Sequence, residues 1–366
     1  MSVGSVTLKK NERNMVGISI GGGAPYCPVL YVVQVFDKSP AGDSGLILPG
    51  DELTAVNERS VKGFTKAQVA KRIQGVGESV TLYYNRLTEE CGRPADIVWK
   101  TIKHKLVESM NPDTADSLGF SRAILVKDRL VQKVLDFESS AKAFSVLVCK
   151  LQAFMLALRS TSYLQKVFGD VLAEIGVKST QPDAHRALTL FGSVHRDIGK
   201  SGMNTANALV TVLKDLGTFL GKAVPDMKLT LKKYANTKFN YLSFCLKVKE
   251  MDDEDYYFIT CGEPLPRLLS GNYHYRQILR ERHKARIEFK TMRSAVTSKL
   301  EFMELKRVQD ISFQLERLMR CLFEYYKWTS ERLRDGNVFP IEVNLDLSMP
   351  FAQTYTEECD DDEDGK

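Results

Sequence analysis

Hydrophobic and polar positions alternate through the first hundred residues and then change to a helical period. Alternation predicts β-strands because successive side chains of a strand point to opposite faces. Three stretches predict strands: residues 18–20, 31–36 and 79–85. A turn that leads into a fourth strand is expected at 49–57. A helical turn is expected at 39–45, and Thr65 is expected to cap a second helix. The sequence therefore predicts a small α+β domain.

The segment 15–23 carries the most specific pattern of this domain. Gly17 allows successive backbone N–H groups to converge on one point, which forms an anion-binding nest. Ile18 and Ile20 then lie on one face of a strand whose free edge would pair with an extended peptide. The pattern favours capture of a peptide C-terminus, with the carboxylate in the nest. A glycine-containing hairpin strand is the alternative for this segment taken alone.

In this order of elements, residues 5–103 resemble a PDZ domain, small and β-barrel-like. The loop 16–18 (Val-Gly-Ile) takes the place of the family's carboxylate-binding loop, and the segment 50–57 matches its Gly-Asp turn. Glu58 stands where the family usually has glycine, so we expect the turn after Asn57 to differ. The resemblance implies a groove that binds the C-terminal tails of other proteins.

The resemblance also assigns the positions of that groove. Lys10 matches the family's basic residue upstream of the loop, and Lys66 matches the position that contacts the ligand's antepenultimate side chain. The predicted peptide-binding residues are Lys10, Val16, Gly17, Ile18, Ser19, Ile20, Lys66, Ala67, Val69, Ala70 and Ile73.

Three long helical segments follow this domain. Apolar residues recur at alternating spacings of four and three over 130–175, 188–248 and 285–325, which is a heptad seam. Neither proline nor glycine occurs from 272 to 335. Pro225 removes one backbone donor inside the second segment, so we expect a bend there, the alternative being two separate helices.

Length and composition support a chain of two folded units. At 366 residues it exceeds what one hydrophobic core usually supports. The sequence shows neither an uninterrupted apolar run of membrane-spanning length nor the apolar core of a signal peptide at its start. Its 7 cysteines form no CxxC pair, which favours reduced thiols in the cytoplasm.

The net charge of +5 is mild, but its distribution is uneven. No acidic residue lies between 227 and 249, where the lysines are Lys228, Lys232, Lys233, Lys238, Lys247 and Lys249. A second basic stretch covers 276–293, with only Glu281 and Glu288 opposed to it. If the second and third helices form a hairpin, both stretches lie near one end and would attract an anionic membrane. A solvated lysine-rich face is the alternative, and nucleic acid is not expected because no recognition motif accompanies the patch.

Three long heptad helices with a basic end resemble a BAR (arfaptin-homology) domain, an all-α coiled-coil dimer. The pairing of the two domains resembles the PDZ–BAR scaffold proteins that interact with protein kinase C. The stretches that carry this likeness are 16–24, 231–234, 241–254 and 338–343. The expected organisation is a PDZ domain at 5–103, a linker with an amphipathic helix at 104–128, a BAR domain at 129–340 and an acidic disordered tail at 341–366.

The resemblance implies a scaffold that binds tails of receptors (glutamate receptors among them), transporters and protein kinase C. It implies a homodimer that binds or senses curved phosphoinositide membrane in receptor trafficking and endocytosis, on endosomal and plasma membrane, and perinuclear and synaptic in neurons. The implied lipid-binding residues are Lys232, Lys233, Lys238, Lys247 and Lys249, and the membrane-inserting helix 113–125 carries Leu118, Phe120 and Ile124. Small GTPases and actin-nucleating machinery are further implied partners. Two alternatives remain: an arfaptin-like GTPase effector, and a dimeric adaptor that does not bind membrane.

The spacing of the candidate residues argues against an enzyme and against a bound cofactor. The segment 199–201 (Gly-Lys-Ser) resembles the end of a phosphate loop, but its upstream glycine is misplaced and it lies within a helix. His195 lies on the apolar seam and is expected in the core. The family's Cys-Pro-Cys, linked to zinc, is here Cys27-Pro28-Val29, and one thiol cannot hold zinc. The acidic run 357–364 lacks the spacing of a calcium cage. We therefore expect neither catalysis nor a cofactor.

Overall fold

The computed structural model describes residues 2–87, 94–110, 129–263, 265, 267 and 270–342. The chain divides into two compact units. Unit 1 joins Met1–Asp128 to Lys228–Ser298, and unit 2 joins Arg129–Met227 to Lys299–Lys366. Two of the long helices therefore contribute residues to both units.

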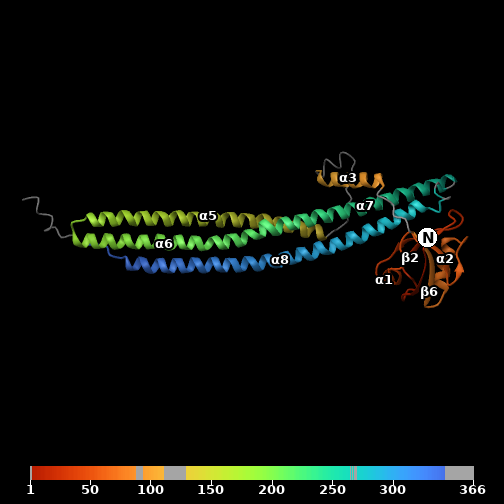
Figure 1. The fold of residues 1–366 in the computed structure, drawn as a ribbon, viewed down its shortest axis with the longest axis horizontal. Coiled ribbons are helices and arrows are strands. Elements are labelled where there is room, and N and C mark those ends of the chain that lie inside the picture. Colours follow the sequence, from red (N-terminus) through yellow and green to blue (C-terminus); the bar gives the residue numbers. More distant parts are fainter. Residues whose placement is uncertain are drawn as a thin grey trace, which may run out of the picture. The chain divides into compact units, whose positions relative to one another are not determined.

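The N-terminal domain of unit 1 is built on one antiparallel sheet (Figure 1). Its strands are β1 (Ser2–Lys9), β2 (Ile18–Gly22), β3 (Leu30–Val35), β4 (Glu52–Val56), β5 (Arg59–Ser60) and β6 (Ser79–Arg86). The order is β1-β6-β4-β3-β2, with β5 on β4, so β2 is an edge strand. The sheet is open between β1 and β2, which corrects the expected barrel-like closure, because no ladder joins these two strands.

Two short helices of this domain begin where their capping residues predict. Ser39 caps α1 (Pro40–Ser44) by accepting a hydrogen bond from the Gly42 N–H at 3.2 Å. Thr65 caps α2 (Lys66–Gly75) through a reciprocal pair with Gln68, at 3.3 Å and 2.9 Å. Such caps satisfy backbone donors that the first turn of a helix leaves without partners.

Unit 1 also contains α3 (Ala95–Ser109) and the adjoining parts of α7 (Val224–Cys261) and α8 (Tyr273–Asp335). One buried apolar cluster joins these helices to the β2–β3 side of the sheet. Its members are Cys27, Tyr31, Ile97, Phe244, Val248, Met251, Tyr275, Ile278, Leu279 and Ala285. The N-terminal domain and the helices therefore share a core within unit 1.

Unit 2 is centred on the antiparallel pair α5 (Arg129–Lys178) and α6 (Pro182–Thr218) (Figure 1). Glycine allows the two backbones to approach closely. A Cβ atom on Gly192 would lie 2.7 Å from the Gly169 carbonyl oxygen, and one on Gly199 would lie 2.6 Å from that of Ser162. The segment 199–201 is thus part of a helix–helix contact, which agrees with its exclusion as a phosphate loop.

A π-helical turn, η1 (Phe219–Ala223), follows α6 and precedes Pro225. The Val224 N–H donates to the Phe219 carbonyl, five residues back instead of four. This wider turn accommodates the proline, whose ring would clash with the carbonyl of the preceding turn and which has no N–H to donate. The predicted irregularity therefore lies in the turn just before Pro225, and the helix continues beyond it.

Candidate functional site

The edge of β2 and the glycine loop before it form the candidate peptide site. Gly17 has φ +83°, and a Cβ atom added there would lie 2.1 Å from Ser39 Oγ. Only glycine fits both the conformation and the space. On its inner side, β2 pairs with β3, so its outer edge has backbone groups available for another strand.

A cavity of about 420 Å³ runs beside this loop and α2. The predicted residues that line it are Val16, Gly17, Ile18, Ile20, Ala70 and Ile73, and Phe36, Asp37 and Lys38 were missed by the sequence analysis. Val69, on the inward face of α2, is fully buried in the domain core. Ser19, Lys66 and Ala67 do not line the cavity, although Lys66 begins α2 as predicted. The lining is mainly apolar, which suits a hydrophobic C-terminal side chain.

Lys10 is directed to the end of α2. Its Nζ donates to the Gln74 carbonyl at 3.0 Å and to the Val76 carbonyl at 2.5 Å. A cation at a helix C-terminus satisfies carbonyls that the last turn leaves without partners. In this structure Lys10 therefore fixes α2 beside the loop and does not line the cavity.

The N-terminal domain contacts α8 through a set of arginines. Arg276 Nε donates to the Gly50 carbonyl at 2.9 Å, and Arg280 Nε donates to the Pro49 carbonyl at 2.7 Å. Arg280 also pairs with Asp51, whose side chain is fully buried. A buried carboxylate needs such a partner, because its desolvation is otherwise costly.

The apolar cluster beside these arginines contains two tyrosines. Tyr31 of β3 contacts Tyr275 of α8 edge-on, with ring centroids 6.0 Å apart, and accepts a hydrogen bond from Asn272 at 3.3 Å. Burial raises the pKa of Tyr31 to about 12. Burial, together with the hydrogen bond to Asp252, also raises the pKa of Tyr275. Cys27, 3% exposed, lies in the same cluster.

These contacts correct the expected role of the basic stretch 276–293. Part of it contacts the N-terminal domain instead of forming one open patch with the lysines of α7. In addition to Arg276 and Arg280, Arg282 donates to the Val33 carbonyl at 3.3 Å and Arg286 pairs with Asp37 at 2.8 Å. Sequence spacing revealed the charges but could not reveal the carbonyls that they meet.

The five predicted lipid-binding lysines differ in their surroundings. Lys232, Lys233 and Lys249 are exposed on α7. Lys247 pairs with Asp96 of α3 at 2.6 Å, and Lys238 lies 5.6 Å from the Phe239 ring centroid. Burial raises the pKa of Asp96, but the Lys247 ammonium lowers it, and the net shift is downward.

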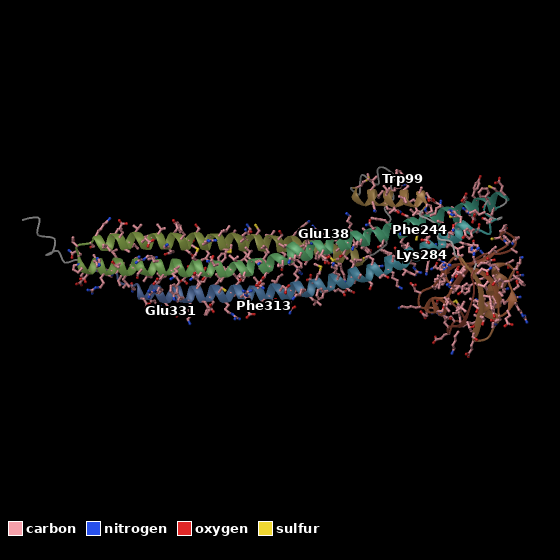
Figure 2. The ribbon with its side chains drawn as sticks, viewed as in Figure 1. Trp99, Glu138, Phe244, Lys284, Phe313 and Glu331 are labelled. Carbon is pink, nitrogen blue, oxygen red and sulfur yellow. The ribbon has the colours of Figure 1, made fainter. Side chains whose placement is uncertain are left out.

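Helix α3 carries apolar residues on both its buried and its exposed face, and the sequence analysis missed it. Ile97 is buried against α7, and Thr101 Oγ lies 3.0 Å from Ser243 Oγ. The other face exposes four large apolar side chains: Val98, Trp99, Ile102 and Leu106. Trp99, labelled in Figure 2, is 69% exposed. The predicted inserting residues Leu118, Phe120 and Ile124 lie outside the described residues, and α3 spans the predicted boundary at 103/104.

Unit 2 exposes many large apolar side chains along α5 and α8. They include Val146, Tyr163, Leu164 and Val171 on α5, and Phe302, Leu305, Phe313, Met319 and Phe323 on α8. The segment Leu130–Lys178 of α5 is also long and apolar enough to cross a membrane, judged by length and composition alone. The sequence analysis expected no such segment, because charged residues interrupt its apolar positions. Its close packing on α6 is that of a helix in a bundle.

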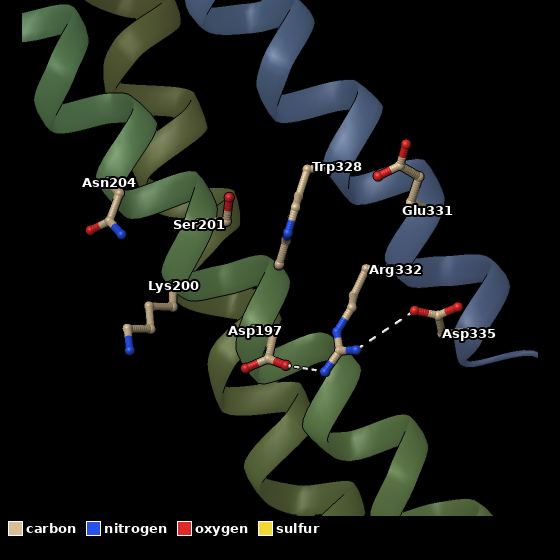
Figure 3. A pocket seen from close by; sticks show the side chains of 8 residues that line it. All are labelled: Asp197, Lys200, Ser201, Asn204, Trp328, Glu331, Arg332 and Asp335. Atoms are coloured by element: carbon tan, nitrogen blue, oxygen red, sulfur yellow. Dashed lines mark hydrogen bonds and ion pairs between the residues drawn. The ribbon is translucent and has the colours of Figure 1, made fainter.

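A polar cavity of about 520 Å³ lies between α6 and α8 in unit 2 (Figure 3). Arg332 pairs there with Asp197 at 2.6 Å and with Asp335 at 3.7 Å. No nucleophile with a base partner is among its lining residues. Across the described part of the chain, no three His, Cys, Asp or Glu side chains gather as metal ligands.

His195 is half-buried between aromatic rings of unit 2, which corrects the expectation that it lies in the core. Its ring contacts Phe168 and Phe191 edge-on, at centroid distances of 4.9 Å and 4.5 Å. Its Nδ1 lies 2.5 Å from Gln165 Oε1, and burial lowers its pKa.

Comparison with known proteins gives two domains, the second of which includes residues of both compact units. Residues 5–85 match the PDZ domain family and residues 98–333 match the arfaptin-like domain family. The PRKCA-binding proteins of Homo sapiens and Pongo abelii are each 49% identical over 344 residues, covering 93% of this chain and 83% of theirs. Arfaptin-1 of Rattus norvegicus is 23% identical over 198 residues, covering 54% of this chain and 50% of its own.

Proposed function

The chain belongs to the family of PRKCA-binding proteins, with a PDZ domain followed by an arfaptin-like BAR domain, and from that premise we propose how this scaffold works. Its groove binds C-terminal tails of protein kinase C, receptors and transporters. Its helical region forms a homodimer that binds curved anionic membrane. Together these activities would direct receptor trafficking and endocytosis at endosomal, plasma and synaptic membranes.

The peptide groove is the observation that carries this proposal. A free strand edge, a positive-φ glycine at its start and an apolar cavity lie together on one small domain. The edge suits an extended backbone, the N–H groups of the loop suit a carboxylate, and the cavity suits the last side chain. No residue of α7 or α8 lines the groove cavity, so the contact with these helices leaves it open.

A binding assay on the full chain tests the groove directly. A labelled peptide ending in Val, Ile or Leu with a free carboxylate should bind, and its amidated form should not. Gly17→Ala should weaken binding at least about tenfold, because the new Cβ meets Ser39. Gly63→Ala is the matched control: its φ is +80° and no atom lies within 4 Å of the added Cβ. Equal binding by free and amidated peptides would refute the carboxylate site.

The residue at the start of α2 affects which side chain the peptide can carry at its antepenultimate position. Ligands with Ser or Thr at the antepenultimate position usually need a histidine opposite, and this chain has Lys66. We therefore propose that an apolar antepenultimate residue is accepted. A peptide array that returned only Ser- or Thr-containing tails would contradict this.

Membrane binding is supported by two neighbouring features of unit 1. The exposed face of α3 carries Trp99 and three aliphatic side chains, with Lys103 and Lys105 exposed beside them. This is the composition of a helix that lies in the interface of an anionic bilayer. Lys232 and Lys233 add exposed charge on α7. Each such cation contributes about 1 kcal/mol near an anionic surface.

Homodimer formation is supported by the exposed apolar residues of unit 2. A second copy would cover these faces of α5 and α8, as heptad seams require. An arfaptin-like GTPase effector and an adaptor that does not bind membrane are the competing functions. Co-sedimentation with phosphoinositide vesicles, beside a pull-down with GTP-loaded small GTPases, distinguishes the three.

A further inference from the structure

Asp37 lies beside the peptide groove and also faces α8. Its neighbour Phe36 donates a backbone hydrogen bond to the Gly17 carbonyl at 3.0 Å, which places Asp37 close to the glycine loop. Asp37 lines the groove cavity together with this loop. It also lines a second cavity, of about 630 Å³, whose other walls come from α8. One carboxylate therefore borders both spaces.

Two cations of α8 meet this carboxylate. Arg286 Nη2 lies 2.8 Å from Asp37 Oδ2, and Lys290 Nζ lies 3.3 Å from the same oxygen. The two residues are four apart on one helix, so their side chains share a face. The bonds that Arg276 and Arg280 make to the 49–51 turn hold this part of α8 against the domain.

The charge at this end of the groove depends on these contacts. Asp37 alone contributes −1 and would oppose an incoming peptide carboxylate. With Arg286 and Lys290 the sum is −1 + 2 = +1, which attracts it. Lys38 also lines the groove, but its charge is the same with or without α8.

We infer that Arg286 and Lys290 of the BAR helix set the affinity of the PDZ groove for a C-terminal carboxylate, by neutralising Asp37. The inference rests on the proposed peptide function and adds to it affinity-determining residues from a different domain. Neither residue lines the groove, so both act through Asp37. The Asp37 side chain is 47% exposed, so the effect is moderate and sensitive to salt.

The test measures peptide affinity on the whole 366-residue chain by fluorescence anisotropy. The probe is a labelled peptide with a free C-terminal Val and otherwise uncharged side chains. Arg286→Gln with Lys290→Gln should weaken binding about three- to tenfold at about 0.05 M salt, since each exposed pair accounts for about two- to fivefold. The difference from wild type should largely vanish at about 0.5 M salt.

Asp37→Asn provides the rescue. In the triple variant with Arg286→Gln and Lys290→Gln, the local charge is zero, midway between wild type and the double variant, so affinity should rise about two- to threefold above that of the double variant. The matched control is Lys306→Gln with Arg320→Gln, which removes two cations from α8 that pair with Asp310 and Glu316 on the same helix. This control should bind as wild type does.

Two results would overturn the inference. Unchanged affinity in the double variant would show that α8 does not act on the groove. A weakened double variant that Asp37→Asn fails to rescue would show that the two cations act by another route. If instead the wild-type chain binds no free-carboxylate peptide, the proposed peptide function itself fails, which is a distinguishable outcome.

Discussion

The two parts of α8 differ in what they meet. Within unit 1, the part at 273–298 donates guanidinium hydrogen bonds to backbone carbonyls and pairs with acids of the PDZ domain. Within unit 2, the part at 299–335 exposes aromatic side chains, with Phe302 67% and Phe323 66% exposed. The sequence shows one unbroken heptad helix over both parts.

The two parts of α8 differ in how precisely a partner must match them. A guanidinium that meets a turn carbonyl and a buried carboxylate requires those atoms at fixed positions. An exposed aromatic row accepts any complementary apolar surface, and a second copy of the same helix is one. The first part of α8 therefore fixes an internal contact, while the second leaves a surface for assembly.

The largest effect is expected from charging the assembly surface. Phe313→Glu with Phe323→Glu places two carboxylates where apolar cover is proposed. Losing a buried aromatic costs about 1.5–3 kcal/mol, and an unpaired charge adds to that, so dimer affinity should fall at least about a hundredfold. Sedimentation at micromolar concentration should then show monomers.

Lys306→Gln is the control on the same part of α8, since Lys306 pairs with Asp310 at 3.0 Å. It should remain dimeric. If the double Phe variant also sediments as a dimer, these aromatic residues are not the interface.

The next largest effect is expected on membrane binding, which should depend on the exposed lysines of α7 and not on the arginines of α8 that contact the PDZ domain. Lys232→Glu with Lys233→Glu changes the charge by four units, worth several times about 1 kcal/mol on an anionic leaflet. Vesicle co-sedimentation should be lost, and peptide binding should persist. A control with the same charge change, Lys9→Glu with Lys62→Glu in the PDZ domain, should sediment normally. Normal sedimentation of the α7 variant would favour the adaptor without membrane binding.

A smaller effect is expected within unit 1. Arg280→Ala removes the cation partner of buried Asp51 and should destabilise the contact by about 3 kcal/mol. Hydrogen exchange should then be faster in the segment 49–51 and in α8 near Arg276. Lys306→Ala is the control, because Lys306 pairs with Asp310 on its own helix. Equal exchange in both variants would show that Arg280 does not hold the domain to α8.

Local chemistry in the sequence predicted much of the fold. The capping box of Thr65, the φ of Gly17 and the absence of proline from α8 each depend on neighbouring residues alone. The edge position of β2 was inferred from the same local pattern and is confirmed. The position of Gly199 within a helix was predicted and is confirmed, although its contact with Ser162 required the structure.

Tertiary contacts could not be predicted in the same way. Helix α3 was missed because apolar residues lie on both of its faces: Ile97 packs on α7, while Trp99 and Ile102 are exposed. A stripe on one side would have indicated the helix. Val69 was assigned to the groove but lies in the core, because successive helix positions are turned by about 100°, which points Val69 inward while Ala70 lines the cavity. The role of Asp37 depends on α8, far along the sequence.

The smallest effect is expected on the pH dependence of stability, and it follows from a comparison of buried polar groups in the two units. Asp51 in unit 1 accepts hydrogen bonds from the Leu48 and Leu87 N–H groups, whereas His195 Nε2 in unit 2 is buried without a hydrogen-bond partner. Burial lowers the pKa of His195, so the folded state prefers the neutral ring. The stability from this preference is present above the unfolded pKa of about 6.5 and is lost as pH falls through the lower folded value. The melting temperature of the wild type should therefore fall more between about pH 7 and pH 5 than that of His195→Gln, and should be nearly flat from pH 7 to 8. Parallel pH profiles for the two proteins would assign the acid sensitivity to other groups.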